Sequence, residues 1–280
     1  MDRHYTLTIS CPDRVGIIAA VTGFIAQHDG FIVEASYHTE EEQFFMRQEI
    51  RADSLPFDAD EFCRRFASLA GEFSMDWKLA DSAKNKRLVI LVSRQDHCLD
   101  DLLHRWRTNE LRVDIPCVIS NHEDLRSFVE WHRIPFIHVD MQDKAQAFER
   151  IAELFEQHRG DTLVLARFMQ ILPPHLCQRY AGRIINIHHS FLPSFVGAKP
   201  YHQAYSRGVK LIGATCHYVT RDLDAGPIIE QDTVRIDHGD TVDDLVRYGR
   251  DIEKTVLARG LRYHVEDRVL VCGNKTIVFK

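Results

Sequence analysis

The sequence predicts an α/β protein of two domains, and three observations support this prediction. The chain has 280 residues, of which 45% are hydrophobic, so it is long enough for two buried cores. A polar stretch without periodicity lies near 83–87. Before it, strand-like and helix-like segments follow a βαββαβ order, and after it short apolar strands alternate with amphipathic helices. We therefore expect one domain over 1–82, a linker over 83–87 and a second domain over 88–280.

The order of elements in the first domain is typical of a ferredoxin-like sandwich. Asp13 is expected to cap a helix whose apolar residues Ile18, Val21 and Ile25 recur at helical spacing. A second helix should present Phe62 to the core. The expected strands span 5–9, 31–37, 43–50 and 73–79, and the second helix spans 61–69.

Alternating strands and helices in the second domain predict a mostly parallel, Rossmann-like sheet. Thr241 and Asp244 are placed to cap a helix with Leu245, Tyr248, Ile252, Val256 and Leu257 on its apolar face. The end of the chain should form a hairpin that turns at Gly273 and Asn274. The expected strands span 88–92, 113–119, 136–139, 162–165, 184–188, 211–219 and 227–236, and the helices before Thr241 span 98–106, 125–131 and 144–156.

Composition excludes several functions. The net charge of −6 argues against nonspecific binding of nucleic acid, which requires a basic surface. The 7 cysteines are scattered and form no Cys-x-x-Cys pair, as expected for reduced thiols in a cytoplasmic protein. No apolar run approaches the ~20 residues of a membrane span, and the start of the chain is unlike a signal peptide.

The strongest candidate for catalysis is the set Asn186, His188 and Asp224. Asn186 and His188 share one face of a short strand, because strand side chains alternate. An amide and an imidazolium can polarise a carbonyl and stabilise its oxyanion, and a nearby carboxylate would orient the imidazole and raise its pKa. Asp224 follows in a glycine-containing turn. The alternative is that all three are ordinary hydrogen-bonded structural residues.

The sequence favours neither a metal nor a nucleotide cofactor. His188 and His189 are expected to point to opposite faces of their strand, so together they could not bind one ion. There is no His-Glu-x-x-His motif, no cysteine pair at zinc spacing, and no Gly-x-Gly-x-x-Gly after a strand.

Several motifs resemble the formyltransferase family, which uses or consumes 10-formyltetrahydrofolate. They are Asn186-Ile187-His188-x-Ser190-x-Leu192-Pro193, Tyr201-His202-Gln203-Ala204, Gly213 to Val219 and Leu223-Asp224-x-Gly226-Pro227, and they keep the family's order over most of 86–280. The resemblance implies that the catalytic residues are Asn186, His188 and Asp224. It also implies a substrate-binding set of Arg167, Phe168, Met169, Gln170, Leu172, His202, His217 and Gly226.

The first 80 residues resemble a different module, the ACT domain, which often binds amino acids. Cys11 to Ala19 looks like its opening, and Gly16 lies where backbone N–H groups could hold a carboxylate. The resemblance implies an effector site at Asp13, Gly16 and Ile17, with glycine or methionine as the effector. It also implies a homodimer or homotetramer. A module that only assembles subunits is the alternative.

The resemblance leaves the acceptor of the formyl group to be inferred. The turn over 93–98 contains no glycine, unlike the phosphate-binding turn of the glycinamide ribonucleotide members, and the acidic chain ends soon after the catalytic domain, unlike the tRNA-directed members. An ACT-like domain fused to a formyltransferase-like domain is the arrangement of the branch that transfers the formyl group to water. We therefore expect hydrolysis of 10-formyltetrahydrofolate to formate and tetrahydrofolate, which balances one-carbon pools for purine synthesis. A formyltransferase acting on a small amine and a non-catalytic amino-acid or folate sensor are the alternatives.

Overall fold

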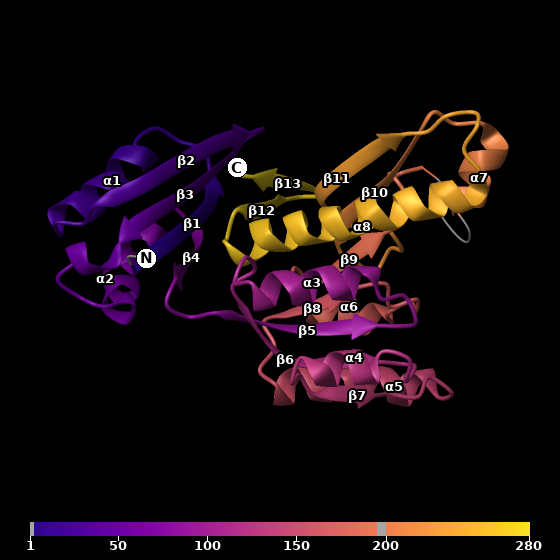
Figure 1. Cartoon of the computed structure of the whole chain (residues 1–280). Coiled ribbons are helices and arrows are strands. Elements are labelled where there is room, and N and C mark those ends of the chain that lie inside the picture. The colour runs from indigo at the N-terminus through magenta and orange to yellow at the C-terminus, as the bar shows by residue number, and fades with distance from the viewer. Residues whose placement is uncertain (1–2, 195–199) are drawn as a thin grey trace. The chain divides into compact units, whose positions relative to one another are not determined.

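The computed structural model describes residues 3–194 and 200–280 (Figure 1). The chain forms two compact units: one contains the residues up to Asn85 together with Glu266–Lys280, and the other is Lys86–Val265. The first boundary, between Asn85 and Lys86, falls within the expected linker. Residues 266–280, which we had expected in the second domain, belong to the first unit instead. Within the described residues, no helix is both long enough and apolar enough to span a membrane.

The first unit contains the expected βαββαβ fold. Its four-stranded sheet has the order β2-β3-β1-β4, and every pair is antiparallel. The two helices cover one face of the sheet with a core that includes Leu7, Val21 and Phe62. The elements are β1 (His4–Pro12), α1 (Ile17–Gln27), β2 (Ile32–Glu40), β3 (Gln43–Arg51), the 3₁₀ helix η1 (Ala52–Ser54), α2 (Ala59–Glu72) and β4 (Asp76–Asp81).

Helix α1 begins later than the sequence suggested. Its N-cap is Gly16, with φ of 99°, and no side chain caps it, so Asp13 is not the cap. A positive φ is accessible to glycine at little cost, which lets the chain turn there and start the helix at Ile17. The buried stripe is consequently Ile17, Val21 and Ile25, while Ile18 is exposed.

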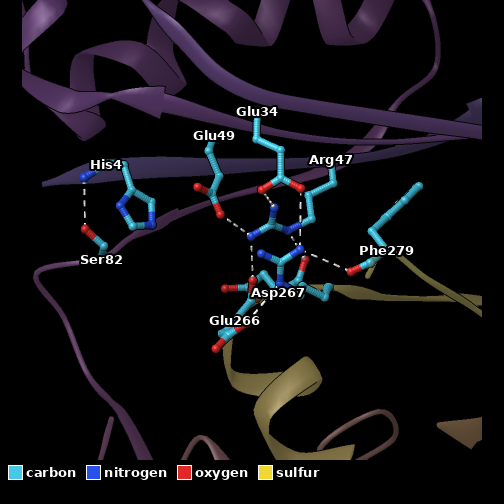
Figure 2. A network of polar contacts seen from close by, with 9 residues as sticks. His4, Glu34, Arg47, Glu49, Ser82, Glu266, Asp267 and Phe279 are labelled. Carbon is cyan, nitrogen blue, oxygen red and sulfur yellow. Dashed lines mark hydrogen bonds and ion pairs between the residues drawn. The ribbon is translucent and has the colours of Figure 1, made fainter. Parts of the chain in front are cut away.

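The C-terminal segment joins the first unit through Arg47, as Figure 2 shows. Arg47 is 1% exposed, and its guanidinium donates to the backbone carbonyls of Glu266 (3.0 Å) and Asp267 (3.1 Å). It also contacts the carboxylates of Glu49 (2.5 Å) and Glu34 (3.5 Å). A buried guanidinium needs such acceptors, so the segment after residue 265 is held on this sheet. It ends in the expected hairpin of β12 (Val269–Cys272) and β13 (Lys275–Val278).

Gln48, on the opposite face of β3 from Arg47, provides a test of the core. Its side chain is fully buried, and neither amide atom has a hydrogen-bond partner in the described part of the chain. Because an unpaired buried polar group costs about 1–3 kcal/mol, we expect Gln48→Met to raise the free energy of unfolding by a similar amount. Urea denaturation would measure this, with the exposed Gln43→Met as the control; a loss of stability in Gln48→Met alone would contradict it.

The second unit is built on a seven-stranded sheet of order β11-β10-β9-β8-β5-β6-β7. The strands from β9 to β7 are parallel, whereas β10 is antiparallel to both of its neighbours, so the expected mostly parallel sheet is confirmed. The strands are β5 (Lys86–Val92), β6 (Val113–Ser120), β7 (Phe136–His138), β8 (Thr162–Leu165), β9 (Ile184–His188), β10 (Leu211–Tyr218) and β11 (Ile228–Arg235). The helices are α3 (His97–Arg107), α4 (Arg126–Trp131), α5 (Lys144–Gln157), α6 (Pro174–Arg179), α7 (Pro200–Arg207) and α8 (Val242–Val265).

Helices cover both faces of this sheet (Figure 1). Side chains of α5 and α6 share a core with Leu163 and Ile184. Helix α8 packs against β9, β10 and β11, where a Cβ at Gly260 would meet Cys216, the partner of Ile187 on β9. Because Ile184 and Ile187 point to opposite faces, α8 lies on the face away from α5 and α6.

The capping box predicted for α8 is present. The Thr241 hydroxyl accepts from the Asp244 N–H (3.2 Å), and the Asp244 carboxylate accepts from the Thr241 N–H (2.9 Å). The buried face of α8 differs from the expected one, because it includes Glu253.

Candidate active site

The structure brings together the three predicted catalytic residues. His188 ends β9, and its Nδ1 lies 3.3 Å from Oδ2 of Asp224. Nδ2 of Asn186 lies 3.2 Å from Nε2 of His217, which is itself 3.8 Å from Oδ1 of Asp224. An amide, two imidazoles and a carboxylate therefore meet at the end of one strand, where ligands bind in open α/β sheets.

Asp224 reaches this position through a tight turn between β10 and β11. Asp224 has φ of 53°, a conformation that aspartate tolerates better than most residues. Gly226 packs so closely on the end of β10 that a Cβ would overlap the carbonyl oxygen of Tyr218. The N–H of Tyr218 donates to the carbonyl of Pro227 (2.9 Å), which fixes the turn. Gly226, predicted to bind substrate, thus serves here to bring the carboxylate to the histidines.

Hydrogen bonding determines which ring nitrogen of His217 carries the proton. Its Nδ1 donates to the carbonyl of Tyr218 (2.9 Å), because a carbonyl can only accept. Burial lowers the pKa of His217, so the ring is neutral at pH 7 and its Nε2 accepts from the amide of Asn186. Burial raises the pKa of Asp224, but its hydrogen bond and electrostatic interaction with His188 outweigh this effect, and the net direction is downward. Asp224 is therefore a carboxylate at neutral pH.

His188 has one ring nitrogen that is not engaged. The residue is 5% exposed, and its Nε2 has no hydrogen-bond partner among the described residues. A buried polar atom without a partner is uncommon in folded proteins and often marks a functional site. This nitrogen can bind a substrate oxygen or exchange a proton with it.

The loop after His188 is anchored by Thr215 of β10. The Thr215 hydroxyl donates to the carbonyl of Ser190 (2.8 Å) and accepts from the N–H of Leu192 (3.0 Å). The amide of Gln231 also donates to it (2.9 Å). These bonds hold the chain on both sides of Phe191, so the position of His188 does not depend on its strand alone.

The predicted substrate segment follows β8. Phe168 and Leu172 are buried, whereas Met169 is 55% exposed. The N–H of Met169 donates to the hydroxyl of Ser93 (3.2 Å), which ties the segment to the turn after β5. Arg167 begins the segment with φ of 64°. Gln170 is partly buried, and its N–H donates to the carbonyl of Phe168 (2.5 Å).

One member of the predicted set lies apart from these contacts. His202 is exposed on α7 and makes none of the contacts described for the site, whereas His217 is fully part of it. In the motif Tyr201-His202-Gln203-Ala204, Tyr201 is the residue whose hydroxyl makes a buried hydrogen bond, to Glu253.

A buried polar network that the sequence prediction missed lies at the same end of the sheet. Glu253 of α8 is 1% exposed, and its carboxylate accepts from His97 Nε2 (2.7 Å) and from the hydroxyl of Tyr201 (2.6 Å). Nε of Arg167 lies 3.4 Å from the same carboxylate. The sequence did contain a signal for this network, because Glu253 is a charged residue on the apolar stripe of α8. A buried carboxylate requires hydrogen-bond partners.

The expected orientation of His189 is wrong. Strand β9 ends at His188, so the alternation of side chains ends there, and the rings of His188 and His189 stack with centroids 5.1 Å apart. Burial, followed by the charge of Arg167, lowers the pKa of His189 to about 4. His189 is therefore neutral at pH 7 and lies between His188 and the network.

This shifted pKa predicts a pH-dependent stability. In the unfolded chain a histidine has a pKa of about 6.5, so only the unfolded state gains this proton as the pH falls from about 6.5 to about 4. We expect the free energy of unfolding to fall by at most about 2 kcal/mol between pH 7 and pH 5 through His189. Urea unfolding at both pH values should show a smaller fall in the free energy of unfolding for His189→Asn than for the wild type. His238→Asn, at an exposed position, should show the same fall as the wild type. Equal falls in all three proteins would refute the prediction.

His97, Cys98 and Glu253 come close enough to suggest a metal site, with ligand atoms within 4.8 Å of one another. The charges around these three residues argue against a metal site. Both carboxylate oxygens of Glu253 already accept hydrogen bonds, and the guanidinium of Arg167 already supplies a positive charge. Burial raises the pKa of the Cys98 thiol well above its usual value, so it is not a thiolate.

A pocket of about 370 Å³ borders this region. His189 and Tyr201 contribute to its wall together with Phe191, Ile212 and Thr233. None of the three predicted catalytic side chains lines it, so this cavity does not include the polar site at the end of β9.

Comparison with known proteins identifies the family of this chain. Residues 86–261 match the formyl transferase family. A formyltetrahydrofolate deformylase of Bacillus subtilis (strain 168) is 48% identical over 278 residues, which cover 98% of this chain and 93% of that protein. The crystal structure of a formyltetrahydrofolate deformylase from Pseudomonas syringae pv. tomato is 63% identical, with a TM-score of 0.98, over 100% of this chain and 95% of that one.

A more distant neighbour matches a smaller part of the chain. It is glycinamide ribonucleotide transformylase 1 from Symbiobacterium toebii, 27% identical with a TM-score of 0.68, covering 72% of this chain and 98% of that one. The full-length matches, by contrast, include the N-terminal unit as well. This chain therefore belongs to the formyltetrahydrofolate deformylase family, within the larger formyl transferase family.

Proposed function

We propose that this chain hydrolyses 10-formyltetrahydrofolate to formate and tetrahydrofolate at the site formed by Asn186, His188 and Asp224. The observation that carries the proposal is the buried Nε2 of His188, which has no hydrogen-bond partner among the described residues, on a ring whose Nδ1 lies 3.3 Å from the carboxylate of Asp224. Deformylases of other organisms that match nearly the whole chain support the same reaction.

The first step is attack of water on the formyl carbon. The formyl oxygen accepts from His188 Nε2–H and from the N–H of Asn186 that is not directed at His217. Asp224 orients the attacking water and takes its proton. The two donors stabilise the negative charge that develops on oxygen as the tetrahedral intermediate forms.

Collapse of the intermediate gives the products. The bond between carbon and N10 breaks, and N10 takes the proton that Asp224 received from water. Tetrahydrofolate and formate leave, and the second proton of the water passes to solvent. Water supplies the new oxygen, so no other reactant is needed. We propose that neither a metal nor an organic cofactor takes part, since the amide, imidazole and carboxylate supply the polarisation and the proton transfer.

The pterin is proposed to bind along the segment that starts at Arg167. Phe168 and Leu172 anchor this segment in the core, while Met169 and Ile171 leave apolar surface exposed beside it. Exposed apolar side chains next to polar backbone groups suit a flat, partly polar heterocycle. Gln170 and the backbone of the segment would supply the hydrogen bonds that orient it.

The deciding experiment is release of formate from 10-formyltetrahydrofolate with no acceptor present. We expect equal amounts of formate and tetrahydrofolate, measured by a formate dehydrogenase assay and by absorbance. Absence of formate release would refute hydrolysis: it would favour transfer to an amine if added amines restored turnover, and a sensor if they did not.

We propose further that the first unit binds an amino acid such as glycine or methionine near Asp13, Gly16 and Ile17. The N–H groups at the start of α1 lack a side-chain cap, and Gly16 leaves open space for a ligand. Titration of each amino acid into the formate assay tests this, and an unchanged rate with both would remove it. A homodimer or homotetramer in the cytoplasm is the assembly we expect, to be measured by light scattering.

A further inference from the structure

Strands β8, β5 and β6 are neighbours in the sheet of the second unit, and a chain of hydrogen bonds joins the residues that follow them. Ser93 and Asn121 belong to this chain and have no part in the steps above. We propose that these two side chains position the substrate segment, residues 167–172, and so set the affinity for the folate without taking part in hydrolysis. The inference rests on the proposed function and names positioning residues for the same site.

The register of the sheet places Ser93 between the substrate segment and Asn121. Val92, the last residue of β5, is paired with Ser120, the last residue of β6, so Ser93 and Asn121 occupy equivalent positions just past the two strands. On the other side of β5, the N–H of Ala166 donates to a backbone carbonyl of that strand (2.9 Å), and the substrate segment begins at the next residue. All three stretches therefore lie at the carboxyl ends of parallel strands, where ligands bind in such sheets.

The hydroxyl of Ser93 is the centre of this chain of hydrogen bonds. Ser93 is 5% exposed, and its hydroxyl accepts from the N–H of Met169 (3.2 Å) and donates to Oδ1 of Asn121 (2.7 Å). An N–H group can only donate, so the single proton of the hydroxyl is left for Asn121. Nδ2 of Asn121 in turn lies 3.4 Å from Nε2 of His122. Asn121 therefore fixes the rotation of the hydroxyl that receives the substrate segment.

The backbone of the substrate segment requires support from outside. Arg167 has φ of 64°, a conformation that residues other than glycine adopt at a cost. The chain then turns sharply, with the N–H of Gln170 directed at the carbonyl of Phe168 (2.5 Å). Phe168 is buried, whereas Met169 is 55% exposed. The bond to Ser93 thus holds the segment at the residue where it leaves the core.

The other neighbour of the substrate segment is the catalytic strand. Leu165, the last residue of β8, is paired with Asn186 of β9, so the segment begins beside the strand end that carries His188. The catalytic side chains are themselves held by β9, β10 and the turn between β10 and β11. In the part of the chain that the structure describes, Ser93 makes no hydrogen bond to any of these three side chains. Loss of Ser93 should therefore affect the segment and leave the catalytic groups in place.

The test separates binding from chemistry in Ser93→Ala. We expect KM for 10-formyltetrahydrofolate and Kd for the product tetrahydrofolate each to rise about tenfold, because the segment loses the hydrogen bond that holds it. Because the catalytic groups keep their positions, kcat should change by less than about twofold. Formate release gives KM and kcat, and isothermal titration calorimetry gives Kd without any turnover.

Three further variants complete the test. Asn121→Ala removes the acceptor that orients the hydroxyl and should raise Kd in the same direction, so it remains informative if Ser93→Ala does not fold. The double variant should bind no more weakly than Ser93→Ala, because both residues act through one hydroxyl. Thr162→Val is the matched control: this buried hydroxyl lies at the opposite end of β8, 2.8 Å from Nε2 of His264. Its removal should leave Kd and KM at wild-type values.

Hydrogen exchange adds a direct measurement, since the amides of 167–172 should exchange faster in Ser93→Ala while those of β9 are unchanged. Three results would overturn the inference: a wild-type Kd in folded Ser93→Ala or Asn121→Ala, a fall in kcat with KM unchanged, and an equal loss of affinity in Thr162→Val. The last would mean that general loss of stability weakens binding. Failure of the proposed hydrolysis would be visible separately, as the absence of formate release by the wild-type protein.

Discussion

Replacing Asp224 with asparagine is expected to lower kcat for formate release by about 10³- to 10⁴-fold, with little change in KM. The carboxylate lies 3.3 Å from His188 Nδ1 and 3.8 Å from His217 Nε2, so it is placed to orient the imidazole and to take the proton of the attacking water. An amide of the same shape keeps the packing of the turn but carries no charge. The amide can also donate a hydrogen bond to Nδ1. The ring of His188 is then held in the neutral tautomer that carries its proton on Nε2.

The neighbouring residues give a graded set of comparisons. Asn186→Ala removes one donor to the oxyanion and should lower kcat by about 10²–10³-fold, and His188→Ala should nearly abolish turnover. Asp222→Asn is the matched control, because this carboxylate lies in the same turn with 71% of its side chain exposed. Single-turnover rates for all four variants would separate chemistry from release of products. Wild-type turnover in His188→Ala or Asp224→Asn would refute the proposed mechanism.

Part of the site could be predicted because Asn186 and His188 lie two residues apart and follow the periodicity of a strand. Asn186 and His188 share a face by simple alternation, and Asp224 lies in a turn marked by Gly226. The helix that Thr241 and Asp244 cap was predictable for the same reason, since both residues of the capping box are local. Local signals of this kind do not depend on the remainder of the fold.

The remaining features depend on contacts between distant segments. Glu253 meets Tyr201 and His97 only after α8 has packed across the sheet, and no spacing in the sequence brings these residues together. The stacking of His189 on His188 arises because the strand ends between them, and the position of a strand end is weakly encoded. The start of α1 shifted because the positive φ of Gly16 outweighed the capping preference of Asp13.

The C-terminal segment is the largest departure from the predicted division, and Arg47 accounts for it. Substitution of a buried, paired charge by an apolar side chain leaves its partners unpaired, which typically costs about 3–5 kcal/mol. In Arg47→Met, the carboxylate of Glu49 and the carbonyls of Glu266 and Asp267 would lose the Arg47 donor, while Glu34 would keep only its contact with Arg268 (Figure 2). We therefore expect a loss of stability of this size in the first unit.

The measurement should follow the two units separately, because they are distinct compact bodies. Hydrogen exchange read by mass spectrometry is expected to show faster exchange in Arg47→Met over β1–β4 and over the hairpin of β12 and β13, with the second unit unchanged. Arg65→Met on α2 removes an exposed arginine that pairs with Glu61 and should leave exchange as in the wild type. If the hairpin kept wild-type protection in Arg47→Met, the other ion pairs of the segment, Arg268 with Glu34 and Lys275 with Glu40, would hold it there instead. Arg47 would then be a buried charge that the first unit tolerates, and the association of 266–280 with the N-terminal sheet would depend on its surface contacts.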